Sequence, residues 1–129
     1  MGDMKDRFRI VVAFAALLAV MAPIALGQSG DVRRIRFKQG RSSTVVRSSI
    51  AKKEIITYLV GATAGQTMDL DISKGTAFRL YTPGGDSLQG GKGVSGATEE
   101  LDETGDYRIE VESRSSKSRV SFSLSVSIR

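Results

Sequence analysis

Apolar and polar residues alternate strictly along the last part of the chain. Val120, Phe122, Leu124, Val126 and Ile128 occupy every second position, and serines stand between them. In an extended strand this period of two sends the apolar side chains to one face and the hydroxyls to the other. The segment therefore predicts a strand with one buried face and one solvated face.

Shorter stretches with a similar pattern recur earlier in the chain. They lie in residues 35–37, 45–50, 55–60, 68–72, 78–80 and 107–111. Turn sequences rich in glycine separate them at intervals of roughly 8 to 12 residues, which is typical of a sandwich or barrel. No segment after Gly27 has a helical period. We predict an all-β fold, a single antiparallel β-sandwich, jelly-roll-like, with about seven or eight strands.

One longer stretch fits neither period. Residues 83–96 are rich in glycine and also contain Pro83, Ser87 and Ser95. Glycine and serine favour turns and irregular backbone. We predict a mobile surface loop here.

The N-terminus has the three parts of a secretory signal peptide. Lys5, Arg7 and Arg9 precede an apolar run at residues 10–22, and Pro23 and the small residues of 25–27 follow. This pattern predicts a cleaved leader at residues 1–27 and an exported domain at residues 28–129, in the periplasm or the medium. The alternative is a retained anchor, because the apolar stretch is near the lower length limit for a bilayer span. Pro23 and the small residues favour cleavage, which would leave no membrane span.

The composition argues against catalysis. The chain has no cysteine and no histidine, so thiol nucleophiles, histidine bases and the usual zinc or copper ligand sets are absent. The segment DLDISKG resembles the start of a calcium loop but lacks the glycine and glutamate that an EF-hand needs. Ser49 and Lys52 match the spacing of a serine–lysine pair but lie at a predicted strand end, not at a helix start. We predict a protein that is not an enzyme and takes no cofactor or metal.

Charge is distributed unevenly along the chain. Eight lysines and arginines fall within residues 33–53 without one acid, and five carboxylates cluster in residues 99–106. Such a basic stretch suits an acidic partner surface, although cations on edge strands also serve to discourage aggregation. Export argues against nucleic acid as the partner. Phe37 is the one aromatic residue interleaved with these cations, and its alternation with Ile35 assigns it to the core.

Several segments resemble a known family. YLVGATAGQTMDLDIS, FRLYTPGGDSL and TEELDETGDYRIEVES resemble the exported β-sandwich modules called pre-peptidase C-terminal domains. With the opening IRFKQGRSSTVVRSSI, the chain from Val32 to Ile128 is similar to the periplasmic inhibitors of goose-type (g-type) lysozyme. The resemblance implies a small β-sandwich that blocks the cleft of a peptidoglycan-cleaving enzyme.

The resemblance also implies a partner-binding site. Tyr58 matches a family tyrosine, and Arg114 matches the first arginine after the YRIEV strand; Lys117 and Arg119 lie in the loop that follows. Arginine binds carboxylates bidentately, and tyrosine offers a large contact area. Two alternatives stay open: Tyr58 as a core residue, and the arginines as a solvated hairpin. At the level of function, the alternative is a non-catalytic envelope-binding module for a protein or an anionic polymer. We expect a monomer or weak dimer.

Overall fold

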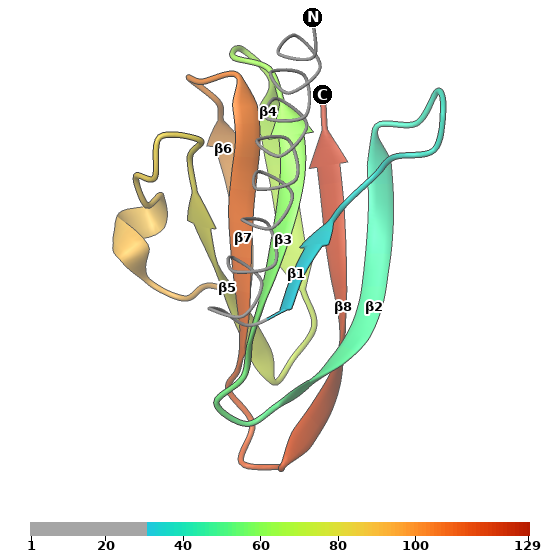
Figure 1. The fold of residues 1–129 in the computed structure, drawn as a ribbon, viewed down its shortest axis with the longest axis vertical. Coiled ribbons are helices and arrows are strands. Elements are labelled where there is room, and N and C mark those ends of the chain that lie inside the picture. The colour runs from blue at the N-terminus through green and yellow to red at the C-terminus, as the bar shows by residue number, and fades with distance from the viewer. Residues whose placement is uncertain (1–30) are drawn as a thin grey trace, which may run out of the picture.

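The computed structural model describes residues 31–129, so the predicted leader lies outside the described residues. These residues form eight strands and one short 3-10 helix (Figure 1). The strands are β1 (Asp31–Arg34), β2 (Ser43–Ala51), β3 (Ile55–Ala62), β4 (Thr67–Ile72), β5 (Thr76–Tyr81), β6 (Gly96–Glu100), β7 (Gly105–Ser113) and β8 (Arg119–Ile128), and the helix η1 spans Gln89–Gly91. Among the described residues, no helix is long and apolar enough to cross a membrane.

The strands form two four-stranded sheets that face each other. The first sheet has the order β1-β3-β7-β5 and the second the order β2-β8-β4-β6. The predicted β-sandwich is confirmed. One pair departs from the antiparallel expectation, because β1 runs parallel to β3.

The core lies between the sheets and is built from the alternating positions of the strands. Phe122, Leu124, Val126 and Ile128 of β8 are all buried, as the alternation predicts. The largest fully buried side chains are those of Tyr58, Tyr107 and Phe78. Burial of these apolar faces is the main stabilising contribution, at about 25 cal/mol per Å².

The stretch from Pro83 to Gly96 is more regular than the sequence predicts. It contains η1, and its flanks are attached to β5 by isolated bridges, Phe78 to Val94 and Tyr81 to Ser87. The backbone N–H of Leu88 also donates to the carbonyl of Leu80 at 2.8 Å. The segment is a surface loop, as predicted, but it contains η1 and its flanks pair with the outer edge of β5.

The turns at one end of the sandwich are joined by backbone hydrogen bonds. The N–H of Lys52, in the β2–β3 turn, donates to the carbonyl of Ser118 in the β7–β8 hairpin at 3.0 Å. The N–H of Arg114 donates to Gly75, in the β4–β5 turn, at 2.8 Å. We call this group of turns, residues 51–54, 73–75 and 114–119, the hairpin end.

Candidate functional site: the basic hairpin end

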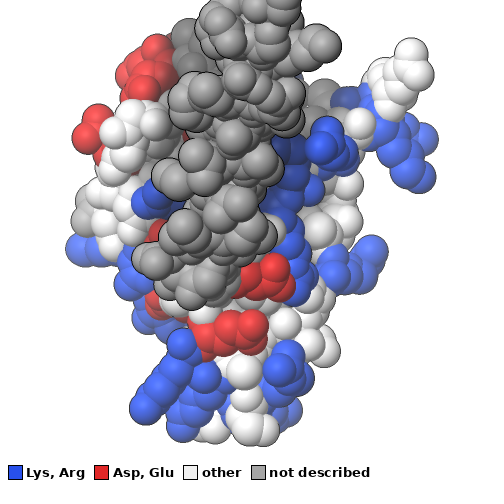
Figure 2. Space-filling view, viewed as in Figure 1, with Lys and Arg blue, Asp and Glu red and all other residues white. Residues whose placement is uncertain are grey.

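The hairpin end concentrates positive charge. Six cations come from its three turns: Lys52, Lys53, Lys74, Arg114, Lys117 and Arg119. The nearby carboxylates are those of Glu54 and Glu112. Figure 2 shows blue side chains at the lower end of the molecule and along its sides, and red ones at the upper left and just above the lower blue group. The acidic residues 99–103 belong to the opposite end, where Leu101 is hydrogen-bonded to Gln66.

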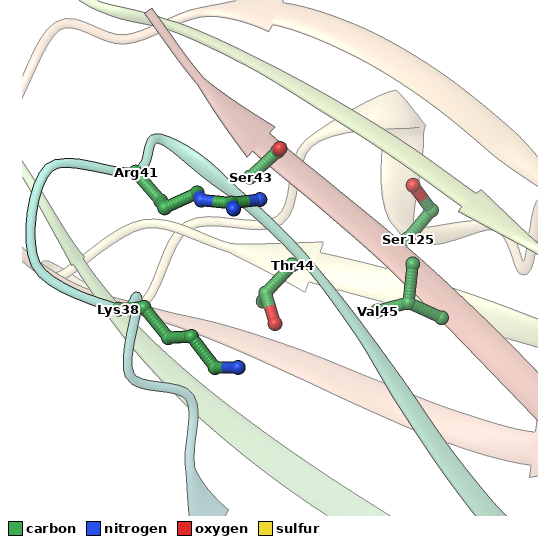
Figure 3. Close-up of a pocket in the computed structure, with 6 residues that line it drawn as sticks. All are labelled: Lys38, Arg41, Ser43, Thr44, Val45 and Ser125. Carbon is green, nitrogen blue, oxygen red and sulfur yellow. The ribbon is translucent and has the colours of Figure 1, made fainter.

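The basic stretch of residues 33–53 does not form one patch. Arg34 is paired with Asp106, with Nη2 and Oδ2 2.6 Å apart, and Arg33 is paired with Asp31. Lys38 and Arg41 instead line a cleft of about 320 Å³ around the start of β2 (Figure 3). The cations of this stretch are thus distributed among ion pairs, this cleft and the hairpin end.

Arg114 lies against the first sheet. Its Nε donates to Oε2 of Glu112 at 2.7 Å, and the same carboxylate also binds Arg79. A Cβ on Gly93 would collide with the Arg114 guanidinium, so this glycine is needed for the close approach. Arg114 is therefore held between Glu112 and the backbone of the segment that follows η1.

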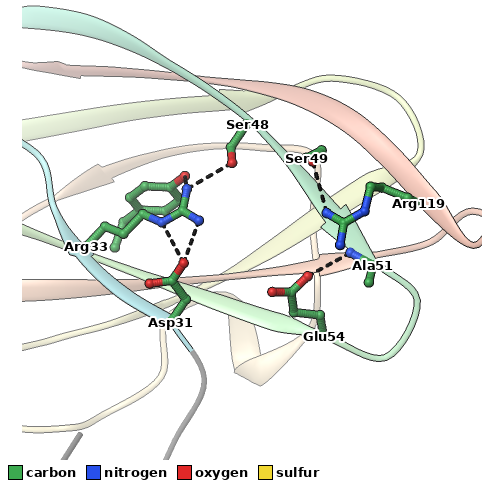
Figure 4. Close-up of polar contacts among 8 residues, drawn as sticks. Asp31, Arg33, Ser48, Ser49, Ala51, Glu54 and Arg119 are labelled. Atoms are coloured by element: carbon green, nitrogen blue, oxygen red, sulfur yellow. Dashed lines mark hydrogen bonds and ion pairs between the residues drawn. The ribbon is translucent and has the colours of Figure 1, made fainter.

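Arg119 extends from the same hairpin toward the other sheet. Its Nη1 donates to the hydroxyl of Ser49 on β2 at 3.0 Å (Figure 4). Among the described residues, Arg119 has no carboxylate within ion-pair distance. Its guanidinium keeps its full charge available to a partner.

Lys117 lies at the tip of the hairpin. Its backbone N–H donates to the hydroxyl of Ser115 at 3.1 Å, which fixes the turn, and the residue is exposed. The structure therefore brings three of the four predicted contact residues together on one hairpin: Arg114, Lys117 and Arg119.

Tyr58 lies elsewhere. Tyr58 is only 1% exposed, and it lies opposite Ile109 of β7 in the middle of the first sheet. Five positions separate Ile109 from Arg114 along β7, which is about 17 Å of extended chain. The Tyr58 hydroxyl is 3.5 Å from Nη1 of Arg33, and burial raises the pKa of the phenol while Arg33 opposes that shift. Direct contact between Tyr58 and a partner stays a prediction of the resemblance.

Sequence reasoning missed the lysines of the other two turns. Lys52, Lys53 and Lys74 are distant from the β7–β8 hairpin in sequence and join it only through the backbone hydrogen bonds between turns. The available signal was positional, because each lysine sits in a turn between two predicted strands. Without the order of the strands in the sheets, the sequence does not indicate which turns lie at the same end of the sandwich.

The chemistry of the hairpin end is that of binding. Among residues 31–129, no group of three or more histidine, cysteine or acidic residues could hold a metal ion. The six cations instead suit carboxylates on a partner surface. Three turns at one end of a rigid sandwich, joined by backbone hydrogen bonds, present these cations together.

Comparison with known proteins places this geometry among solved structures. The sequence matches no protein-family model and no curated protein. The structure of Aeromonas hydrophila PliG, a periplasmic lysozyme inhibitor of g-type lysozyme, is similar with a TM-score of 0.69 and 28% identity, over 78% of this chain and 98% of that one. The fold is that of the PliG inhibitors.

Two further structures support this assignment of the fold. PliG from Salmonella Typhimurium has a TM-score of 0.62 at 23% identity, over 78% of this chain and all of that one (100%). A pre-peptidase C-terminal domain of collagenase from Bacillus anthracis has a TM-score of 0.50 at 10% identity, over 79% of this chain and 98% of its own. The PliG structures are those of inhibitor proteins, not enzymes.

Proposed function

We propose that the chain is an exported, periplasmic inhibitor of g-type lysozyme and that it acts through the hairpin end. The observation that carries the proposal is the likeness to Aeromonas hydrophila PliG, at 28% identity over 98% of that protein. The basic hairpin supports it, because Arg114, Lys117 and Arg119 lie together on the exposed β7–β8 hairpin at one end of the sandwich. The predicted leader at residues 1–27 accounts for export.

Inhibition follows from the chemistry of the target. Glycosidases cleave with carboxyl groups that line a cleft. A guanidinium that enters such a cleft binds a carboxylate through two parallel hydrogen bonds and excludes the substrate. Arg119 is suited to this role because among the described residues no carboxylate neutralises it. Arg114, fixed by Glu112, and Lys117 supply the surrounding contacts.

The charge distribution also favours this orientation. The whole chain carries 19 basic and 14 acidic residues, a net charge of +5, and the leader accounts for three of the former and two of the latter. Residues 28–129 are therefore basic, but their acidic cluster lies away from the hairpin end. A partner that presents carboxylates meets mainly cations at the hairpin end, which accelerates association.

An assay of cell-wall lysis tests the proposal. Purified residues 28–129 are mixed with a g-type lysozyme, and we expect lysis to stop at a molar excess. Arg119→Ala and Arg114→Ala should each weaken inhibition by about tenfold or more, as is typical for buried interface arginines. Arg41→Ala, at the opposite end of β2, is the matched control and should inhibit normally.

Two outcomes contradict the proposal. Unchanged lysis at a large excess of folded protein removes inhibition as the function and leaves the non-inhibitory envelope-binding module. Inhibition that survives both arginine substitutions shows that the hairpin is not the contact surface.

A further inference from the structure

The outer edge of the second sheet is formed by β2. This strand has nine residues, Ser43–Ala51, and pairs with β8 on one side only. Among residues 31–129, no other strand pairs with its second side. Long unpaired edges are ready templates for another strand, so proteins usually cover or interrupt them.

The hydrogen-bond pattern shows which residues of β2 face the open side. Register is regular from Ser43 opposite Ser127 to Ala51 opposite Arg119. The N–H of Ile128 donates to Ser42 at 2.8 Å, and the N–H of Lys52 donates to Ser118 at 3.0 Å. Because hydrogen-bonded pairs alternate in an antiparallel ladder, the even-numbered residues of β2 bond to β8. The odd-numbered ones direct their N–H and C=O groups outward: Ser43, Val45, Arg47 and Ser49.

The surroundings of this edge are basic. Lys38 and Arg41 lie on either side of the start of β2, around the cleft that Ser43, Thr44 and Val45 help to line (Figure 3). Arg47 lies at the middle of the strand and is exposed. Among the described residues, none of these three cations has an ion-pair partner.

Two carboxylates on this side of the molecule are already engaged. Asp31 is bound by Arg33, and Glu54 accepts the backbone N–H of Ala51 at 2.8 Å (Figure 4). An acidic strand on the β2 edge would therefore meet three cations that no ion pair neutralises among the described residues, while the exposed Asp71 lies two strands away on β4. Val45, which is 47% exposed, adds an apolar contact.

A second copy of this chain fits the edge poorly. Antiparallel pairing of β2 with itself about its centre would place Arg47 beside the same arginine of the other copy. Like charges in directly opposed positions of a ladder destabilise the pair. Charge complementarity thus favours a different, acidic strand over self-association.

We propose that the free edge of β2 binds an extended acidic segment of a partner protein by strand addition. Backbone hydrogen bonds from Ser43, Val45, Arg47 and Ser49 supply the affinity, and Lys38, Arg41 and Arg47 select glutamate or aspartate side chains. This surface meets the hairpin end only at Ser49, whose hydroxyl accepts from Arg119, and the proposal does not depend on lysozyme inhibition.

Amide hydrogen exchange measured by NMR tests the proposal directly. The probe is a synthetic peptide of about seven residues that alternates glutamate with threonine and valine. We expect exchange to slow by about tenfold or more at Val45, Arg47 and Ser49, the amides that face the open edge. The amides of Val46 and Ser48 already bond to β8 and should change little. Binding should weaken as salt rises.

Three controls separate strand addition from plain charge attraction. The same peptide with glutamine in place of glutamate should bind clearly more weakly. Val45→Pro removes one outward N–H without removing a bond to β8, so the fold is kept and the protection is lost. Arg47→Glu changes only an exposed side chain and should weaken binding of the acidic peptide.

The results that overturn the proposal are distinct. Chemical-shift changes without protection of the odd-numbered amides indicate a nonspecific polyanion surface. Protection that appears without peptide and grows with protein concentration indicates a second copy on the edge. Unchanged exchange at saturating peptide removes the site. Because lysis is not measured, none of these results bears on inhibition.

Discussion

Arg114 and Glu112 lie two residues apart on the same side of the sheet, and their side chains are joined by a 2.7 Å contact between Nε and Oε2. The same carboxylate binds Arg79, whose Nε donates to the carbonyl of Gly91 at 3.0 Å. Glu112 therefore ties the β7–β8 hairpin to the segment around η1. The orientation of Arg114 therefore depends on Glu112 and on the segment around η1.

Gly93→Ala should displace Arg114. A Cβ at this position would lie too close to Nη2 of Arg114, so the guanidinium must shift from its present place beside Glu112. We expect weaker lysozyme inhibition in the lysis assay and a small loss in the free energy of unfolding. The double variant with Arg114→Ala should regain the stability, because the clash is gone. Equal losses in the single and double variants would show that Arg114 and Gly93 are not coupled.

Tyr107→Phe should destabilise the sandwich by about 1 to 3 kcal/mol. The buried hydroxyl donates to the carbonyl of Glu103 at 2.7 Å and accepts its N–H at 3.2 Å, as in a tyrosine corner. Removing it leaves both backbone groups without this partner. Urea unfolding gives the measurement, and Tyr81→Phe is the control, because the Tyr81 ring would still contact Arg108 at 4.4 Å from its centroid. Equal stability of the two variants would contradict the prediction.

Tyr58→Phe distinguishes the two interpretations of this tyrosine. The residue is 1% exposed, so burial predicts that inhibition persists when only the hydroxyl is removed. The free energy of unfolding should change little, because the 3.5 Å contact with Arg33 is long for a hydrogen bond. Inhibition curves for this variant and Arg119→Ala give the comparison. Loss of inhibition with an intact fold would assign Tyr58 to the contact surface.

Acid should weaken the fold through two surface carboxylates. Hydrogen bonds from Arg34 lower the pKa of Asp106, and those from Thr98 and Arg129 lower the pKa of Asp69, both from 3.8. A carboxyl group whose pKa is lower in the folded than in the unfolded protein stabilises the folded state at every pH above the unfolded pKa. This contribution is lost as the pH falls from the unfolded pKa through the folded pKa. We expect the free energy of unfolding to decline below about pH 4.

Asp106→Asn tests the same point. It removes one titrating group, so the stability of the variant should depend less steeply on pH in this acidic range. Asp102→Asn provides the comparison, since Asp102 is an exposed carboxylate in the same acidic cluster. A steeper decline in Asp106→Asn than in the parent protein would contradict the assignment.

Strands with a clear period of two could be predicted from the sequence, and β8 shows why. Its inward positions are apolar without exception, so one register satisfies the core. In contrast, β6 was missed because its sequence, GATEE, has little apolar character and only Ala97 packs against the core. This strand is specified by its pairing with β4.

The candidate site could be predicted only in part for a similar reason. Arg114, Lys117 and Arg119 are neighbours in sequence, and a hairpin keeps them together in space. Lys52 and Lys74 reach the same end through tertiary hydrogen bonds between turns. The location of Tyr58 in the core was one of two open alternatives, because alternation alone does not say how deeply a strand tyrosine is buried.

The central place of β8 in the second sheet has a consequence for how the protein matures. This strand pairs with both β2 and β4, yet it follows all seven other strands along the chain. Before it is made, β2 has no neighbour and the second sheet cannot close. We therefore expect the second sheet, and with it the sandwich, to close only after synthesis has passed residue 128.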